Sequence, residues 1–382
     1  MFIRRILIDQ ETQTNDSATR RLPLPRLGIL SGLEVRTSIT NGATRGTERV
    51  FDAIDRIQVV ADGSNVIFDL EGSEAYRWAH HFLKREPPHI WDETNAVVQR
   101  LTLPVPFGRW LGDPEFALDL SQFRDVELRI QFSPTIAGTA FATGTTQFHV
   151  IALIDDESDY TGRLRGYLRT VQVNAFTSLA SGDTQIELAR TYPYFDIHVF
   201  AREATTADGT NITRAQVWAN DRSRIPFDGR WDDIQALNEH VHGVDATHDG
   251  RLLVGDTNTF DSHTGRIISL ALTPVFVQSD ANGIITVMAG SIAGDRVTMS
   301  VSDTADAAAS THFTAAAASR DVRFVAKGLG VGNSILIPFA DGLDPDLSLA
   351  SRDLGRLQLV LTNGDAGADV RVSTREWVPL AA

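Results

Sequence analysis

The chain of 382 residues contains no cysteine and very little lysine. Without thiols, the sequence excludes a disulfide scaffold, thiolate zinc sites, iron–sulfur clusters and a cysteine nucleophile. Lys84 and Lys327 are the only lysines among 35 basic residues, so nearly all positive charge is carried by arginine. Arginine suits interface ion pairs because its fork is planar and pre-organised. Genomic base composition explains the same bias, so the arginines alone do not identify an interface.

Long apolar runs are also absent from the sequence. No segment approaches the roughly 18 uninterrupted apolar residues that a membrane-spanning helix needs. Residues 1–8 carry arginines in the middle, and the apolar run after them is too short for the core of a signal peptide. We therefore expect a protein that is made and folded in the cytoplasm.

The balance of charge is acidic, with 49 acidic residues against 35 basic ones and a formal net charge of −14. A surface of that sign repels polyphosphate, so the charge disfavours nucleic-acid binding by the surface as a whole. We predict no direct sequence-specific nucleic-acid partner.

Most of the chain alternates between apolar and polar residues with a period of two. Residues 126–132 are typical, because every second side chain is apolar (Val126, Leu128, Ile130 and Phe132). Many short strands with turn residues between them indicate an all-β sandwich or barrel. The predicted strands include residues 33–39, 57–59, 66–70, 101–103, 126–132, 148–153, 186–188, 195–199, 267–272, 275–277, 297–301, 322–324, 357–361 and 370–372.

Two stretches show helical spacing instead. Residues 73–84 place apolar side chains at intervals of three and four, and Pro87 and Pro88 follow. The second stretch begins at Trp231 and ends at Gly243, a residue type that commonly terminates helices. We predict one helix in each stretch. The alanine-rich residues 305–318 are ambiguous between a loop and a frayed helix.

The two predicted helices lie in matching surroundings, which indicates an internal repeat. Residues 58–61 (Gln-Val-Val-Ala) precede a turn, a short strand and the first helix, and residues 216–219 (Gln-Val-Trp-Ala) precede the same features in the second copy. Each helix is followed by a Pro-Phe pair, at Pro106 and Pro338, then by an acidic loop and an alternating strand. The second copy holds an insertion of strands and long loops between its helix and its Pro-Phe strand, in residues 243–332.

Each copy resembles a jelly roll, in which eight strands form two packed sheets. Two such copies in tandem resemble the double jelly-roll major capsid proteins of tailless icosahedral viruses, the lineage of the tectivirus-like phages and the adenovirus hexon. The resemblance covers roughly residues 30–382 and rests on the order of features in the repeat, since the family has no diagnostic catalytic motif. Residues 9–21 are polar and residues 22–25 (Leu-Pro-Leu-Pro) are predicted to be extended, so we predict an N-terminal arm at residues 1–28. The two copies of the repeat then give a first jelly roll at 29–160 and a second, more elaborate one at 161–382.

The resemblance also implies a function and partners. The chain would be a structural subunit of a virion, without catalysis or a cofactor, forming homotrimers with a pseudo-hexagonal outline that tile an icosahedral shell. Its partners would be neighbouring capsomers, minor capsid proteins and an internal membrane. We expect the basic cluster in the arm to contact a neighbour or the inside of the shell. The cluster comprises Arg4, Arg5, Arg20, Arg21 and Arg26.

Three further residues are candidates for interface contacts. Trp91 and Trp110 lie in turn-like surroundings, and Arg109 precedes the second of them. Aromatic side chains and arginine dominate the energetics of protein interfaces. Three other tryptophans, Trp78, Trp218 and Trp231, follow the apolar pattern of their segments and are predicted to pack in the core.

The sequence offers only weak metal-ligand candidates. His240 and His242 are two residues apart on a predicted helix and point in different directions, so we predict no metal site there. Acidic loops at Asp155 and Asp156, and at Asp341 and Asp344, would suit calcium in a coat that locks after assembly, but neither matches an EF-hand loop.

Two alternatives to a coat subunit remain open at this point. A carbohydrate-binding protein, an adhesin or a receptor-binding spike would expose several tryptophans on one concave face. A β-sandwich hydrolase would bring two carboxylates together in a cleft. A coat subunit requires neither feature.

Overall fold

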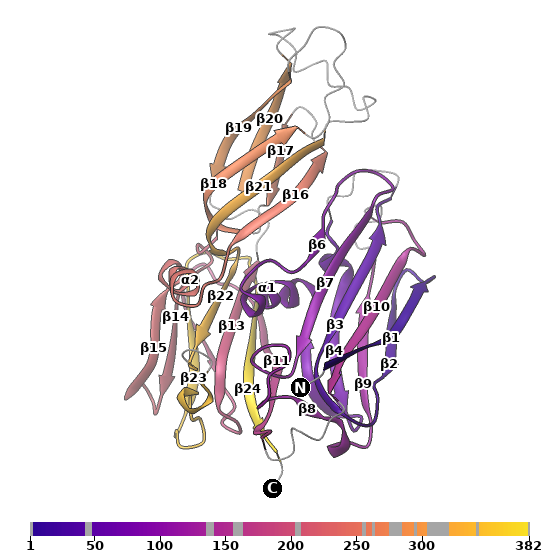
Figure 1. Cartoon of the computed structure of the whole chain (residues 1–382). Coiled ribbons are helices and arrows are strands. Elements are labelled where there is room, and N and C mark those ends of the chain that lie inside the picture. Colours follow the sequence, from indigo (N-terminus) through magenta and orange to yellow (C-terminus); the bar gives the residue numbers. More distant parts are fainter. Residues whose placement is uncertain are drawn as a thin grey trace.

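Figure 1 shows a computed structural model of the chain, in which strands stand side by side in two upright bodies with a third group of strands above one of them. The structure describes residues 3–42, 48–134, 141–155, 163–202, 208–253, 257–261, 264–274, 285–293, 296–303, 321–340 and 344–380. The predicted all-β class is confirmed. The strand predicted at 275–277 and the alanine-rich residues 305–318 lie outside the described residues.

The first jelly roll consists of two sheets that face one another. The first sheet has the order β1-β10-β3-β7-β6, and the short β8 also pairs with β3. Its strands are β1 (Ile3–Gln13), β3 (Ile29–Thr40), β6 (His89–Ile90), β7 (Val98–Pro106), β8 (Leu118–Asp119) and β10 (Thr146–Asp155). The facing strands have the order β2-β9-β4-β5. They are β2 (Ala18–Pro23), β4 (Ile54–Ala61), β5 (Asn65–Leu70) and β9 (Val126–Phe132).

The second jelly roll repeats this arrangement strand for strand. Its two sets of strands have the orders β11-β24-β13-β22 and β12-β23-β14-β15. If β6 and β8 are set aside, each set pairs the strands at the same positions in chain order as its counterpart in the first roll. The predicted repeat is therefore confirmed. The strands are β11 (Gly166–Thr177), β12 (Gly182–Glu187), β13 (Tyr194–Arg202), β14 (Ile212–Ala219), β15 (Arg224–Arg230), β22 (Ser334–Pro338), β23 (Leu357–Asn363) and β24 (Asp369–Pro379).

One helix follows the fifth strand of each roll. Helix α1 (Gly72–Leu83) buries Ala75, Trp78 and Ala79 against the first roll, and Lys84 ends it in a left-handed conformation. Helix α2 (Trp231–His240) buries Trp231 and Ile234 in the second roll. The predicted helices are confirmed to within a few residues. The first begins at Gly72, where an added Cβ would lie 2.3 Å from the carbonyl oxygens of both Phe51 and Ile54.

The predicted N-terminal arm is wrong for residues 3–23. These residues form β1, which pairs with β10 along its whole length, and β2, which pairs with β9. The polar residues between 9 and 21 suggested an arm, but Ile6, Ile8 and Leu22 pack on the core of the first roll and pull both strands into its sheets. The predicted boundary between the rolls, at 160, lies among residues 156–162, outside the described part.

The predicted insertion in the second roll is a separate group of strands above it (Figure 1). It consists of two three-stranded sheets with the orders β16-β21-β18 and β17-β20-β19. We call these strands the tower. They are β16 (Thr247–Leu253), β17 (Thr257–Asp261), β18 (Thr264–Pro274), β19 (Ile285–Ala293), β20 (Arg296–Asp303) and β21 (Asp321–Val331).

Short 3₁₀ helices complete the described elements. They are η1 (Val50–Ala53), η2 (Leu120–Gln122) and η5 (Pro345–Leu347). The acidic loop of each roll contains an Asp-Pro pair in which the aspartate accepts a hydrogen bond from the backbone N–H two residues on. The distance is 3.0 Å for both Asp113 and Asp344. The two loops that the repeat paired therefore make the same local turn.

Candidate functional site

The two rolls are joined through a single continuous sheet, and this junction is the first part of the candidate site. Strand β5 of the first roll runs parallel to β11 of the second, which pairs Phe68 with Thr170 and Asp69 with Val171. The Nε–H of Arg169 donates to the carbonyl oxygen of Val66 at 2.9 Å. As a result, one eight-stranded sheet extends across both rolls.

Two of the strands that end a sheet, β1 and β15, are the counterparts of the strands that meet at this junction. Strand β1 ends the first sheet of the first roll, and β15 ends the last sheet of the second roll. Most residues of both strands are exposed or half-buried, including Leu7 on β1 and Ile225 on β15. An unpaired strand edge offers N–H and C=O groups for pairing with another chain.

The predicted basic cluster lies on and beside the edge of β1. Arg4 and Arg21 are exposed, and Arg5 pairs with Glu34 at 2.7 Å while most of its side chain stays in solvent. Arg20 is half-buried and makes a two-point contact with Asp9, at 2.9 and 3.2 Å. This hydrogen bonding raises the pKa of Arg20. The structure therefore gathers four of the five predicted arginines on two strands of one roll, and the fifth, Arg26, is exposed in the connection after β2.

The other predicted interface residues have different surroundings. Trp110 is 42% exposed and remains available to a neighbour. Arg109 contacts Asp113 through Nε at 2.7 Å and Nη2 at 2.8 Å, and a second carboxylate, Glu115, lies 2.8 Å away. Trp91 is only 6% exposed. Arg109 and Trp91 are thus engaged within the chain, and Trp91 offers little exposed surface to a neighbouring chain.

The predicted calcium loops are only partly described. Asp155 ends β10 and is buried, and Asp344 caps η5 by accepting from the backbone N–H of Asp346. Asp156 and Asp341 lie outside the described residues. The described acids of the two loops therefore do not form a cluster with each other.

A cluster that the sequence analysis missed joins the tower to the first roll. Glu86, His89 and His248 bring their ligand atoms within 4.8 Å of one another. Glu86 and His89 follow α1, whereas His248 comes from β16, far along the chain. His89 is two residues from Trp91, a predicted interface residue, but nothing in the sequence links it to His248.

The hydrogen bonds of this cluster determine which ring nitrogen of His248 carries the proton. The Nη1 of Arg49 lies 2.8 Å from Nε2 of His248, and a guanidinium only donates, so Nε2 holds the lone pair. The proton is then on Nδ1, which donates to Oε1 of Glu86. The hydroxyl of Tyr76 donates to the same oxygen, and burial raises the pKa of Glu86. His89 places both ring nitrogens against backbone carbonyl oxygens, of Pro87 at 3.1 Å and of Asp249 at 2.8 Å.

This arrangement is therefore a hydrogen-bonded network that connects the tower to the first roll. A metal ligand must present an unprotonated nitrogen to the ion, and the donors around His248 oppose that. Trp91 belongs to the same fastening, because the guanidinium of Arg49 lies 3.5 Å from its ring centre and Phe324 of β21 packs edge-on against it at 5.3 Å.

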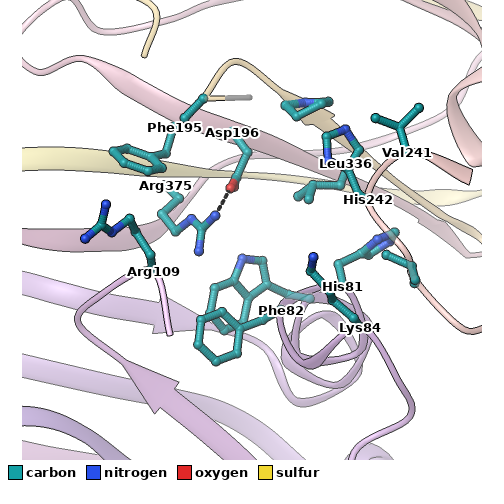
Figure 2. A pocket seen from close by; sticks show the side chains of 14 residues that line it. His81, Phe82, Lys84, Arg109, Phe195, Asp196, Val241, His242, Leu336 and Arg375 are labelled. Atoms are coloured by element: carbon teal, nitrogen blue, oxygen red, sulfur yellow. Dashed lines mark ion pairs between the residues drawn. The ribbon is translucent and has the colours of Figure 1, made fainter. Parts of the chain in front are cut away.

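A cavity of about 180 Å³ lies between the two rolls. Figure 2 shows Phe82 and Lys84 at the end of α1 on one side, and Phe195, Asp196 and Leu336 on strands of the second roll on the other. Asp196 and Arg375 form a buried ion pair in its wall. Burial raises the pKa of Asp196, while the neighbouring Arg375 lowers it.

Five of the six tryptophans are buried or half-buried, and only Trp110 is exposed. Trp78, Trp218 and Trp231 are core residues, as predicted. The row of exposed tryptophans that a sugar-binding face would need is therefore not formed. No helix among the described residues is long and apolar enough to cross a membrane.

Comparisons with known proteins agree with this architecture. No protein-family model and no curated protein matches the chain. Solved structures match along its whole length. The major capsid protein of Sulfolobus Turreted Icosahedral Virus (STIV) matches with a TM-score of 0.60 and 11% identity, over 100% of this chain and 98% of that chain.

Two further capsid proteins match in the same way. The major capsid protein P2 from bacteriophage PM2 has a TM-score of 0.54 and 11% identity, over 100% of both chains. VP54 of PBCV-1, fitted into a reconstruction of the virophage Sputnik, has a TM-score of 0.53 and 10% identity, over 98% of this chain and 93% of that chain. The chain is thus a double jelly-roll protein. Its structural neighbours are the double jelly-roll major capsid proteins, as the resemblance implied.

Proposed function

We propose that the chain is the major capsid subunit of an icosahedral virion, synthesised in the cytoplasm of the host. The observation that carries the proposal is the match of both rolls, over essentially the full length of both chains, to proteins named as major capsid proteins. The buried tryptophans argue against the adhesin alternative. A structural role requires no catalytic residue, and we propose that the chain is not an enzyme.

We further propose that three copies form a homotrimer with a pseudo-hexagonal outline. Within one chain, the fifth strand of the first roll (β5) lies beside the first strand of the second roll (β11). The same two kinds of strand are left over at the ends, as β15 and β1. If β15 of one chain pairs with β1 of the next chain in the same way, six rolls alternate around a closed ring. Head-to-tail contacts of this kind close into a ring when the rotation fits.

The internal repeat predicts the register of this contact. Strands β1 and β11 each contain one bulge against their partner, at Ile8 and at Val173. Counting back from the bulges makes Arg4 the counterpart of Arg169, the residue that donates to β5 within the chain.

A second set of counterparts aligns the fifth strands. Asp69 lies opposite Gln58 and pairs with Arg56. In the same way, Asp228 lies opposite Gln216 and pairs with Arg214. Asp228 of β15 is therefore the counterpart of Asp69.

These counterparts define the proposed contact between chains. The hydrogen bond from Arg169 to Val66 becomes one from Arg4 to the carbonyl of Ile225. The pair Thr170–Phe68 becomes Arg5 beside Phe227, and the pair Val171–Asp69 becomes Ile6 beside Asp228. The first residue of each pair is on β1 and the second is on β15 of the next chain. In this register the predicted basic residues Arg4 and Arg5 serve the trimer contact.

The absence of cysteine from the chain allows a direct test. The double variant Ile6→Cys with Asp228→Cys places two thiols at the proposed contact, where paired Cα atoms would lie within the range that a disulfide bridges. On mild oxidation we expect covalent multimers up to a closed trimer on a non-reducing gel. Val171→Cys with Asp69→Cys, the matching pair within one chain, should cross-link without any increase in mass.

An out-of-register pair serves as the second control. Ile6→Cys with Arg224→Cys moves one thiol four residues along β15, roughly 13 Å away at 3.3 Å per residue, so no cross-link is expected. Failure of the Ile6–Asp228 pair while the internal pair forms would contradict the proposed contact. Light scattering and negative-stain images of the unmodified chain test the trimer itself, which should have about three times the mass of the 41.8 kDa chain.

The shell supplies the remaining proposed partners, namely neighbouring capsomers, minor capsid proteins and an internal membrane. Exposed Trp110 and exposed Arg21 are the described candidates for such contacts, since neither is part of the proposed trimer register. The net charge of −14 suits a coat that stays separate from the genome.

A further inference from the structure

The cavity between the two rolls combines an apolar wall with an excess of cationic side chains. On the α1 side, the rings of Trp78 and Phe82 stack with their centres 5.2 Å apart, and Phe195 faces them from β13. The charged residues that line the cavity are Lys84, Arg109, Arg375 and Asp196. Three cations to one carboxylate is the reverse of the balance in the whole chain, where acids outnumber bases.

The charges in the wall are not equally available. Arg109 pairs with Asp113 and Glu115, neither of which lines the cavity. Arg375 is neutralised by Asp196, but its Nε and the Oδ1 of Asp196 are buried atoms for which the structure gives no hydrogen-bond partner. Buried polar atoms of this kind normally have a partner from protein, water or ligand. Lys84 is exposed and lines the cavity. Asp196 is the one carboxylate among the cavity-lining residues, and it pairs with Arg375.

The ends of both helices also reach the cavity, and a bare helix C-terminus would repel an anion. Here several of the terminal carbonyl oxygens already accept hydrogen bonds. The carbonyl of His81 accepts from the N–H of Lys84, and that of Lys84 accepts from Asp245. In α2, the carbonyls of Leu237 and Glu239 accept from residues of the following turn. Because Arg109 and Arg375 are paired with carboxylates, Lys84 is the cation of the cavity wall that would attract an anion.

The size of the cavity limits the ligand. A cavity of about 150 Å³ accommodates one benzene molecule, and this one is about 180 Å³. We propose that it binds a small organic monocarboxylate with a flat apolar body, the ring against the Trp78–Phe82 pair and the carboxylate toward Lys84. The binding residues come from both rolls, so the occupant would join the two halves of the chain at a point away from the β5–β11 junction.

Benzoate is the probe for this proposal, with two analogues of the same shape as controls. Benzamide is neutral, and benzylamine is cationic. In calorimetric or NMR titrations of the full chain, we expect benzoate to bind at least tenfold more tightly than benzamide, and benzylamine not to bind. Inorganic phosphate, which has charge but no apolar body, should not displace benzoate. Equal binding of benzoate and benzamide, or displacement by phosphate, would overturn the proposal.

The two lysines of the chain provide a matched pair of variants. Lys84→Gln removes the cation at the cavity, whereas Lys327→Gln removes an exposed one on the tower, outside the cavity lining. Both positions are exposed, so both variants should fold. We expect a loss of benzoate affinity of about tenfold for the first and no change for the second. Equal affinities for the two variants would show that benzoate binds elsewhere. The titration does not depend on assembly, so the result is independent of the proposed capsid role.

Discussion

The two jelly rolls use the same strand order to support different surroundings. In the first roll, α1 is enclosed between the core of its own roll, the second roll and the base of the tower, so its polar residues His80, His81 and Glu74 are buried. In the second roll, α2 keeps Asp232 and Asp233 in solvent. The same repeated helix therefore holds buried polar residues where neighbouring elements cover it and exposed acidic residues where they do not. Matched substitutions in the two rolls test this difference.

The largest effect is expected at the start of α1. Gly72→Ala would place a Cβ 2.3 Å from two backbone carbonyl oxygens, which belong to η1 and β4 and have little freedom to move. We expect a loss of about 3 kcal/mol in the free energy of unfolding, at the upper end for overpacked sites. Urea denaturation measures it. Ser73→Ala, one residue later on the half-buried side, is the control, and a similar loss there would contradict the steric explanation.

The next prediction compares the acidic residues at the third position of the two helices, Glu74 in α1 and Asp233 in α2. Burial raises the pKa of Glu74 to about 8, whereas Asp233 occupies the same position of α2 in solvent. The carboxyl of Glu74 holds its proton more tightly in the folded state than in the unfolded chain. Its contribution to the stability of the fold is therefore fully present below pH 4.5. Its contribution is lost as the pH rises from there to 8.

Glu74→Gln should therefore stabilise the chain at pH 7, by on the order of 3 kcal/mol from the linkage relation, and hardly at all at pH 4.5. Asp233→Asn should leave the stability unchanged at both values. Unfolding curves at pH 4.5, 7 and 8.5 give the comparison. A Glu74→Gln effect that does not grow with pH would show that the carboxyl is ionised in the folded chain.

The smallest effect compares the repeated arginine–aspartate pairs. Arg56 with Asp69 is partly buried beside the second roll, whereas Arg214 on β14 with Asp228 on β15 is exposed. Arg56→Gln should cost about 1 kcal/mol, and Arg214→Gln should have no measurable effect on the isolated chain. If β15 becomes covered in a trimer, the Arg214 variant should weaken assembly, which light scattering at decreasing concentration would detect.

Much of the fold could be predicted because alternation and turn residues are local signals. Every predicted strand that lies among the described residues overlaps an observed strand, and only the one at 186–188 extends past its strand, by one residue. The Gln58 and Gln216 motifs occupy equivalent strands. The arm was mispredicted because β1 and β2 are half-exposed, so their polar residues hide the alternation. The Glu86–His89–His248 network could not be predicted, since its members meet only when the tower folds back over α1.

The position of the tower also has a consequence for the order of folding. In the first roll, residues 84–97 connect α1 to β7, whereas in the second roll residues 241–333 separate α2 from β22. Strand β22 cannot pair with β13 until the whole tower has been synthesised, and longer connections close at a greater entropic cost. The first roll, complete by residue 155, is free to fold on the ribosome while the second is still open. The exposed side of β5 then offers β11 a preformed edge on which the second roll begins.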